Sequence, residues 1–221
     1  MKLIKLNATV TASNDRDADE LRKKLKAQGT LLINLMSSAG SGKTTLLSRV
    51  IRDLPEIKIG VMEADIESEV DAERIEALGA KAVQVHTSGM CHMDAGMTAA
   101  AVEAIGQEDV DLLFLENVGN LICPAEYDTG AGKKLMILSV PEGDDKPLKY
   151  PLMFAESDAL AITKTDALPY FDFDMEKCKE RVKKLNPDIE IFPVSAKTGE
   201  GMEALEGWIK DAVEEWKNKD E

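Results

Sequence analysis

A glycine-rich segment at residues 36–45, MSSAGSGKTT, has the composition and spacing for binding phosphate. It follows an apolar run typical of a buried strand and precedes a run typical of a helix. Glycine lets backbone N–H groups turn toward one point and hold phosphate oxygens. Lys43 would place its charge on the β- and γ-phosphates, and the Thr44 hydroxyl would bind Mg²⁺. These features predict a P-loop. Ser37 stands where the consensus has glycine, and the alternative is a glycine turn that only caps a helix.

Two polar motifs later in the chain favour a guanine nucleotide. Residues 163–166, TKTD, resemble the N/T-K-x-D motif of GTPases, and residues 195–197, SAK, match the element whose backbone supports the base. The Asp166 carboxylate can accept from the ring N–H and the exocyclic amine of guanine together, while the Lys164 stem lies along the base. Thr163 takes the usual asparagine position, so we expect weaker contacts that tether the loop. The SAK segment could also be a polar turn that caps the last helix.

Two carboxylates are candidates for holding Mg²⁺ and supporting hydrolysis. Asp65 ends the string EAD after the second apolar segment, and Glu116 opens the string ENVG after the fourth. The second string resembles the D-x-x-G switch of GTPases with Glu in place of Asp, and the Gly119 N–H could sense a γ-phosphate. Solvated acids at strand ends are the alternative, and because no glutamine lies beside Gly119 to position water, we expect slow intrinsic hydrolysis. The predicted catalytic residues are Lys43, Asp65 and Glu116, and the predicted Mg²⁺ ligands are Thr44, Asp65 and Glu116. The predicted nucleotide-binding residues are Gly40, Ser41, Gly42, Lys43, Thr44, Thr45, Gly119, Lys164, Asp166, Ser195, Ala196 and Lys197.

A cysteine–histidine pair and a more distant cysteine form a candidate metal site. Cys91 and His92 follow the third apolar segment, and Cys123 lies in the stretch that begins at the ENVG string. Two thiolates and an imidazole suit a borderline-soft divalent ion such as Ni²⁺ or Zn²⁺. The sequence contains no C-x₂-C pair of the kind that indicates a structural zinc site. Three ligands leave one coordination position of the metal vacant or require a ligand from a partner chain. Spacing alone does not exclude the alternative that the two cysteines are buried thiols and that the histidine is unrelated to them. The third cysteine, Cys178, lies in a predicted amphipathic helix, where we expect it to pack.

The predicted elements would place all these motifs at one edge of a sheet. Short apolar strands separated by helices predict an α/β fold with a mostly parallel sheet and helices on both faces. Right-handed crossovers then bring the loops after the strands to the carboxyl edge of the sheet. The expected strands are 31–36, 59–63, 82–86, 112–115, 134–140, 159–163 and 190–194. The expected helices are about 14–28, 44–53, 68–78, 94–105, 174–185 and 202–216. The long loop-like stretch is 119–133.

The composition is that of an acidic globular protein. A chain of 221 residues, with 31% charged and 44% hydrophobic residues, is long enough for one sizeable domain and short for two, so we expect a single P-loop GTPase domain over residues 1–221. The net charge of −14 argues against a nucleic-acid partner. The sequence has no apolar run of membrane-spanning length and no signal-peptide core, so we expect no membrane insertion. Three cysteines are too few for a disulfide framework, which favours a cytoplasmic location.

Longer strings around these motifs resemble the HypB family of hydrogenase maturation GTPases. They are CHMDA at 91–95, ENVGNLICPA at 116–125 and EGDDKPLKYP at 142–151, and with the segments 37–45 and 63–67 the resemblance spans about residues 14–216. It implies a SIMIBI-type P-loop domain that binds GTP or GDP with Mg²⁺ and helps to insert nickel into [NiFe] hydrogenase. Ni²⁺ or Zn²⁺ would be bound through Cys91, His92 and Cys123.

The resemblance also implies partners. They are a second copy of the chain in a nucleotide-dependent homodimer with the metal at the interface, hydrogenase maturation proteins, and the large subunit of [NiFe] hydrogenase. Residues 143–151 are a candidate for contacts across the dimer. Some family members carry an N-terminal cysteine motif or a histidine-rich tract; this sequence has neither, so we expect no high-affinity N-terminal site and no nickel storage.

Two other functions could use the same P-loop. A small-molecule kinase would prefer adenine, which the TKTD and SAK pair disfavours. A switch GTPase without metal transfer would bind protein partners only. The sequence leaves the resident metal open between Ni²⁺ and Zn²⁺, because the Irving–Williams order favours both over lighter metals.

Overall fold

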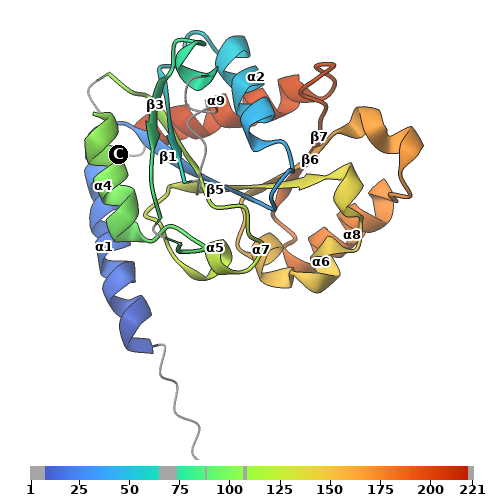
Figure 1. Ribbon diagram of the computed structural model, residues 1–221, viewed down its shortest axis with the longest axis horizontal. Coiled ribbons are helices and arrows are strands. Elements are labelled where there is room, and N and C mark those ends of the chain that lie inside the picture. The colour runs from blue at the N-terminus through green and yellow to red at the C-terminus, as the bar shows by residue number, and fades with distance from the viewer. Residues whose placement is uncertain (1–7, 65–73, 88, 107–108, 219–221) are drawn as a thin grey trace, which may run out of the picture.

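The computed structural model describes residues 8–64, 74–87, 89–106 and 109–218, with side chains from residue 12 onward. Its centre is one sheet of seven strands in the order β3-β2-β4-β1-β5-β6-β7, and every neighbouring pair is parallel (Figure 1). The expected α/β class is therefore confirmed. The strands are β1 Leu31–Ser37, β2 Ile59–Glu63, β3 Lys81–Gln84, β4 Leu112–Glu116, β5 Lys133–Ser139, β6 Ala159–Thr163 and β7 Glu190–Pro193.

All seven expected strands are present, with ends within about two residues of the prediction. The reason is their burial: β1, β2 and β6 are buried along their whole length, as expected for strands covered on both faces. Such strands consist of continuous apolar runs, and these are easy to recognise in a sequence.

The long helices also match the prediction. They are α1 Ala8–Ala27, α2 Lys43–Asp53, α4 Ala95–Ile105, α8 Met175–Leu185 and α9 Met202–Asn218. Helix α1 begins earlier than the expected residue 14. Most of the expected helix 68–78 lies outside the described residues, and its described part is helical at residues 74–76.

Short helices between the strands were not predicted. They are α5 Cys123–Glu126, α6 Lys146–Lys149, α7 Pro151–Ala155 and the 3₁₀ turns η1 Val140–Glu142 and η2 Thr165–Tyr170. The description of 119–133 as a loop is wrong at α5. One or two turns are too short for a helical period to show, and a proline in the first turn, as in α5, α6 and α7, is the remaining signal.

Helices cover both faces of the sheet, as expected. Helices α2 and α9 pack on one face, where Leu46 and Ile209 join Ile33 of β1 in one core. On the other face, α1 and α4 cover β2 and β4, while α7 and α8 cover β5 and β6 (Figure 1). Cys178 of α8 is fully buried in the second of these cores, which confirms its packing role. No helix in the described ranges is long and apolar enough to cross a bilayer.

The strand order determines where ligands can bind. After β1 the chain builds β2, β3 and β4 on one side, and from β5 onward it builds the other side. Parallel sheets bind ligands beyond the carboxyl ends of the strands, near the point where the order reverses. The segments that follow β1, β4 and β6 therefore meet there, together with the loop that follows β3.

Candidate nucleotide and metal sites

The segment after β1 has the geometry of a phosphate-binding loop. Gly40 and Gly42 adopt positive φ angles of 73° and 100°, which L-residues with side chains rarely adopt. Gly42 is the residue before α2, so the free N–H groups and the positive dipole end of that helix face the loop. A pocket of about 440 Å³ opens here. Its lining residues are Ala39, Gly40, Gly42, Lys43, Thr44, Thr45, Ala64, Arg74, Glu116, Asn117, Gly119 and Lys164.

Ser37 does not disturb this loop. It is the last residue of β1, it is fully buried, and its hydroxyl donates to the Ser38 carbonyl oxygen at 2.9 Å. A residue in an extended strand needs no glycine. The departure from the consensus is therefore compatible with the loop.

The TKTD segment is fastened to the P-loop. The Thr163 hydroxyl donates to the Ser41 carbonyl oxygen at 2.8 Å, and Lys164 Nζ donates to the Gly40 carbonyl oxygen at 2.8 Å. Lys164 adopts a left-handed conformation with φ 60°, which directs its stem past Gly42. Thr163 therefore makes one buried bond to the P-loop, and the expectation that this tether is weaker than one made by asparagine stays a prediction.

The two guanine motifs meet as the sequence predicts. The Ser195 hydroxyl donates to Asp166 Oδ1 at 2.7 Å and accepts from the Thr198 amide at 3.2 Å. The segment is also a hydrogen-bonded turn before α9, since Ser195 N donates to the Glu200 carbonyl oxygen at 2.9 Å. The SAK string is therefore a polar turn that also contacts Asp166, and its role in supporting a base stays a prediction. Asp166, Ser195, Ala196 and Lys197 are not among the residues that line the phosphate pocket, and their roles stay predictions.

Oxygen ligands for a hard cation lie beside the P-loop. The Thr44 hydroxyl lies 3.5 Å from Glu116 Oε1, and both residues line the phosphate pocket. A hydroxyl and a carboxylate are the donors that Mg²⁺ prefers. Asp65, the third predicted ligand, lies outside the described residues, although the amide of the preceding Ala64 donates to the Glu116 carbonyl oxygen at 2.9 Å.

Gly119 lies against the P-loop backbone. A Cβ atom at this position would lie 2.9 Å from the Ala39 amide nitrogen, closer than real Cβ contacts come. Only glycine therefore fits without movement of the P-loop. The predicted switch glycine thus occupies a place from which it can respond to the phosphates.

Three residues that sequence reasoning missed also belong to this region. Arg74 and Asn117 line the pocket. The Glu142 carboxylate accepts from the Ser38 hydroxyl and from the amide and hydroxyl of Ser139, the latter two at 2.7 Å, and so joins the P-loop to the end of β5. The S-x-x-E spacing of a capping box at 139–142 is the signal that could have identified Glu142.

The structure brings the candidate metal ligands together. The sulfurs of Cys91 and Cys123 lie 2.8 Å apart, and Cys91 Sγ lies 3.8 Å from His92 Nδ1. One ligand atom from each of the three residues falls within 4.8 Å of the others. Cys91 is exposed, Cys123 is half-buried and His92 is buried, so a metal ion could enter from the solvent side. This donor set fits Ni²⁺ or Zn²⁺.

Neighbouring groups shift the pKa values of two of these ligands in opposite directions. Burial lowers the pKa of His92, against the opposing effect of Asp94 and Glu126, and this favours the neutral imidazole that binds metals. The hydrogen bond with Cys91 raises the pKa of Cys123, so metal binding must displace a proton there. The Tyr127 ring stacks on His92 with centroids 3.8 Å apart and fixes the imidazole plane.

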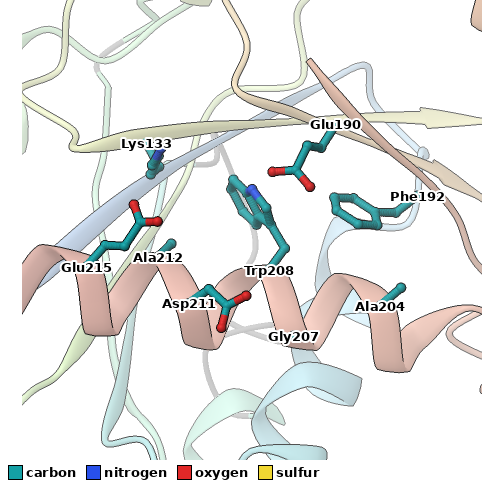
Figure 2. A pocket seen from close by; sticks show the side chains of 9 residues that line it. All are labelled: Lys133, Glu190, Phe192, Ala204, Gly207, Trp208, Asp211, Ala212 and Glu215. Atoms are coloured by element: carbon teal, nitrogen blue, oxygen red, sulfur yellow. The ribbon is translucent and has the colours of Figure 1, made fainter. Parts of the chain in front are cut away.

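A second pocket, of about 300 Å³, lies away from all these motifs (Figure 2). Trp208 and Phe192 line it, with ring centroids 6.2 Å apart. Lys133 and Glu190 are the first residues of β5 and β7, so this pocket lies at the amino ends of those strands. No predicted site residue lines it, and the site remains at the carboxyl edge.

Comparison with known proteins agrees with this geometry. Residues 31–193 match the family described as "CobW/HypB/UreG, nucleotide-binding domain". The chain is 45% identical over 210 residues to the hydrogenase maturation factor HypB of Rhizobium leguminosarum bv. viciae, which covers 95% of this chain and 70% of that protein. It is 44% identical over 210 residues to HypB of Escherichia coli K12, with 95% and 72% covered.

A solved structure extends the likeness to the fold. The crystal structure of HypB from Helicobacter pylori in complex with nickel is 38% identical and superposes with a TM-score of 0.88, covering 95% of this chain and 99% of that chain. The expected P-loop fold of SIMIBI type is thereby confirmed. The chain belongs to the CobW/HypB/UreG family of nucleotide-binding proteins and, within it, to the HypB hydrogenase maturation factors.

Proposed function

We propose that this chain is a GTP-hydrolysing metallochaperone that binds Ni²⁺ or Zn²⁺ and delivers nickel during the assembly of [NiFe] hydrogenase. The observation that carries the proposal is the convergence of Cys91, His92 and Cys123 beside the nucleotide switch. The nickel complex of the related Helicobacter pylori protein supports it. A cytoplasmic location is part of the same proposal.

The nucleotide would be held by groups with complementary chemistry. The backbone amides of the P-loop and Lys43 would bind the phosphates, while Asp166, oriented by Ser195, would accept from the guanine edge. Mg²⁺, when bound to Thr44, Glu116 and Asp65, would neutralise charge that develops on the phosphates. Glu116 would also help to orient the attacking water. The bond from Ser195 to Asp166 favours GTP over the adenine nucleotide of a small-molecule kinase.

The switch segment would connect nucleotide state to metal affinity. Gly119 contacts the P-loop at Ala39, and Cys123 follows only four residues later in the chain. A γ-phosphate that moves Gly119 would therefore move Cys123 relative to Cys91. Such a movement changes metal affinity only if the two nucleotide states hold the thiols at different separations. A switch GTPase without metal transfer would have no need of this arrangement.

A second chain would complete the metal site. Three ligands leave one position of a tetrahedral site open, so a homodimer that forms with GTP can share ions across its interface. Leu148 and Leu152 are exposed, at 64% and 44%, on the short helices after η1 and are candidates for this contact. Hydrogenase maturation proteins and the hydrogenase large subunit would receive the metal.

Titration of Ni²⁺ into the GDP form and into a form with a non-hydrolysable GTP analogue tests the proposal. We expect different affinities in the two forms and loss of binding in Cys91→Ala. Cys178→Ala is the matched control, since this thiol is fully buried and does not belong to the group of ligand atoms. Equal affinity in both forms, together with unchanged binding by Cys91→Ala, would exclude metal transfer. Competition between GTP and ATP tests the nucleotide choice separately.

A further inference from the structure

We propose that helix α1 positions the metal site, with Asn14 and Arg22 holding the two ligand-bearing segments at a fixed separation. The first segment runs from residue 91 to residue 95, and the second from residue 123 to residue 131. The inference rests on the metal binding proposed above. Both residues would act through groups adjacent to the ligands, and neither would bind metal.

The Asn14 side chain joins the two segments directly. Its Oδ1 accepts from the Ala95 amide at 2.9 Å, and its Nδ2 donates to the Asp128 carbonyl oxygen at 2.8 Å. Ala95 begins α4, three residues after His92. Asp128 follows Tyr127, whose ring stacks on His92. One amide group therefore spans the two segments that carry the ligands.

Arg22 holds the second segment from a position about two turns further along α1. Its Nη2 lies 2.7 Å from both carboxylate oxygens of Asp128, and its Nε donates to the Ala131 carbonyl oxygen at 3.1 Å. The side chains of Arg22 and Asp128 are only 30% and 31% exposed, so water screens this pair less than a fully exposed one. Three hydrogen bonds from the planar guanidinium thus fix both the position and the direction of the segment.

Close packing against α1 leaves this segment little freedom. Gly130 has a φ of 79°, and a Cβ atom there would lie 2.9 Å from Leu21 Cδ2 and 3.1 Å from the Ala18 carbonyl oxygen. The Gly130 amide also donates to Asp128 Oδ1 at 2.9 Å. On the other side of the site, α4 packs beside α1 in a shared core (Figure 1). Helix α1 is thus in contact with both segments.

A metal site depends on this kind of support. Metal–sulfur and metal–nitrogen distances fall within about 2.0–2.3 Å, so a loop that drifts by an ångström no longer offers its ligand. Residues that orient ligands typically change metal affinity by about 10- to 100-fold when they are removed. We expect the lower end of that range here, because Asn14 and Arg22 act through the backbone and through Asp128.

The test compares Asn14→Ala, Asn14→Asp and Arg22→Ala with Lys23→Ala, an exposed residue of the same helix. Ni²⁺ affinity is measured by competition with a chelator, and coordination is followed by the absorption bands of bound Co²⁺. Nucleotide affinity and the melting temperature of the metal-free protein are recorded in parallel. Asn14→Asp keeps the acceptor for Ala95 but loses the donor to Asp128, so it tests the bridge if Asn14→Ala fails to fold.

We expect about tenfold weaker Ni²⁺ binding and altered Co²⁺ bands in the Asn14 and Arg22 variants. Lys23→Ala should behave as wild type, and nucleotide affinity should not change in any variant. Wild-type affinity and Co²⁺ bands in folded Asn14→Asp and Arg22→Ala would overturn the positioning role. If wild-type protein binds Ni²⁺ independently of Cys91 and Cys123, the proposed function fails instead, so the two failures are distinguishable.

Discussion

The side-chain oxygen of Asn117 accepts a hydrogen bond from the Met93 amide at 3.2 Å, which links the switch segment to the loop that carries His92. Asn117 is fully buried and lines the phosphate pocket. Its oxygen also accepts from the Val118 amide at 2.9 Å, and its Nδ2 donates to Asn34 Oδ1 of β1 at 3.0 Å. One side chain therefore contacts the strand before the P-loop, the switch and the metal loop.

Replacement of Asn117 by alanine should uncouple nucleotide state from metal affinity. The substitution leaves the buried amide of Met93 and the half-buried amide of Val118 without their acceptor, and an unsatisfied buried group costs about 1–3 kcal/mol. We expect a loss of about 3 kcal/mol in the free energy of unfolding, measured by urea denaturation. We also expect the difference in Ni²⁺ affinity between the GDP and GTP-analogue forms to shrink.

Asn186→Ala provides the matched control for this experiment. Asn186 also caps backbone groups, since it donates to the Ala155 and Ser157 carbonyl oxygens and accepts from the Asp188 and Ile189 amides. It lies at the end of α8, far along the chain from both ligand loops. It should lose stability and keep the coupling. If both variants keep the coupling, Asn117 is only a structural residue.

Much of the fold was predictable because β1, β2 and β6 are buried on both faces and therefore apolar throughout. The geometry of the P-loop was predictable for another reason, and the TKTD and SAK strings were recognisable for the same one, although their role in binding guanine stays a prediction. Their chemistry depends on glycine, lysine, threonine and aspartate at fixed spacings within a single turn. Local patterns of this kind need no knowledge of distant contacts.

The contacts that join distant segments could not be predicted. Asn117, Glu142 and Asn14 act through pairs separated by 24, 104 and 114 residues, respectively, and no periodicity reports such pairs. The convergence of Cys91 and Cys123 was only a hypothesis for the same reason, because it depends on where β3 and β4 end in the sheet. Strand order, which the sequence does not state, decides these contacts.

Loss of the Asp166 carboxylate should remove the preference for guanine. Asp166→Asn replaces an acceptor of two guanine N–H groups with an amide that repels one of them, and hydrogen bonds to charged groups contribute about 1.5–3 kcal/mol each. We expect about a hundredfold loss of GTP affinity, measured with a fluorescent GTP analogue. Ser195→Ala should cause about a tenfold loss, since Asp166 loses the donor at 2.7 Å. Asp172→Asn, an exposed neighbour, should bind GTP normally.

The three cysteines should differ in their reaction with iodoacetamide. Burial raises the pKa of Cys178 to about 12, so almost no thiolate forms at neutral pH. Cys91 is exposed and Cys123 half-buried, and both should react in the native protein. We expect Ni²⁺ to protect Cys91 and Cys123, and urea to expose Cys178, as measured by mass spectrometry. Alkylation of native Cys178 at the rate of Cys91 would contradict this assignment.

The ionised carboxylate of Glu206 should destabilise the folded protein at neutral pH. Burial, followed by the interaction with Asp53, raises the pKa of the Glu206 carboxyl. The folded protein then binds a proton more tightly than the unfolded chain, so stability falls as pH rises from the ordinary glutamate range through the raised pKa. Because the residue is only half-buried, we expect Glu206→Gln to stabilise by only a few tenths of a kcal/mol at pH 7. The gain should vanish at pH 4, as measured by thermal unfolding at both values.

A methyl group at position 119 should disturb the P-loop through its backbone. The Cβ of Gly119→Ala would lie 2.9 Å from the Ala39 nitrogen and 3.0 Å from its Cα, and backbone atoms cannot move aside as a flexible side chain can. We expect at least a tenfold loss of GTP affinity, by the same fluorescence assay, because the amides that hold the phosphates must shift. Gly207→Ala is the control: a Cβ there meets nothing within 4 Å, and alanine favours helix α9 by about 0.5–1 kcal/mol. That variant should unfold at a higher temperature and bind GTP as wild type does. Normal GTP affinity in Gly119→Ala would show that the switch can withdraw from the P-loop without consequence, and Gly119 could not then transmit the nucleotide state to Cys123.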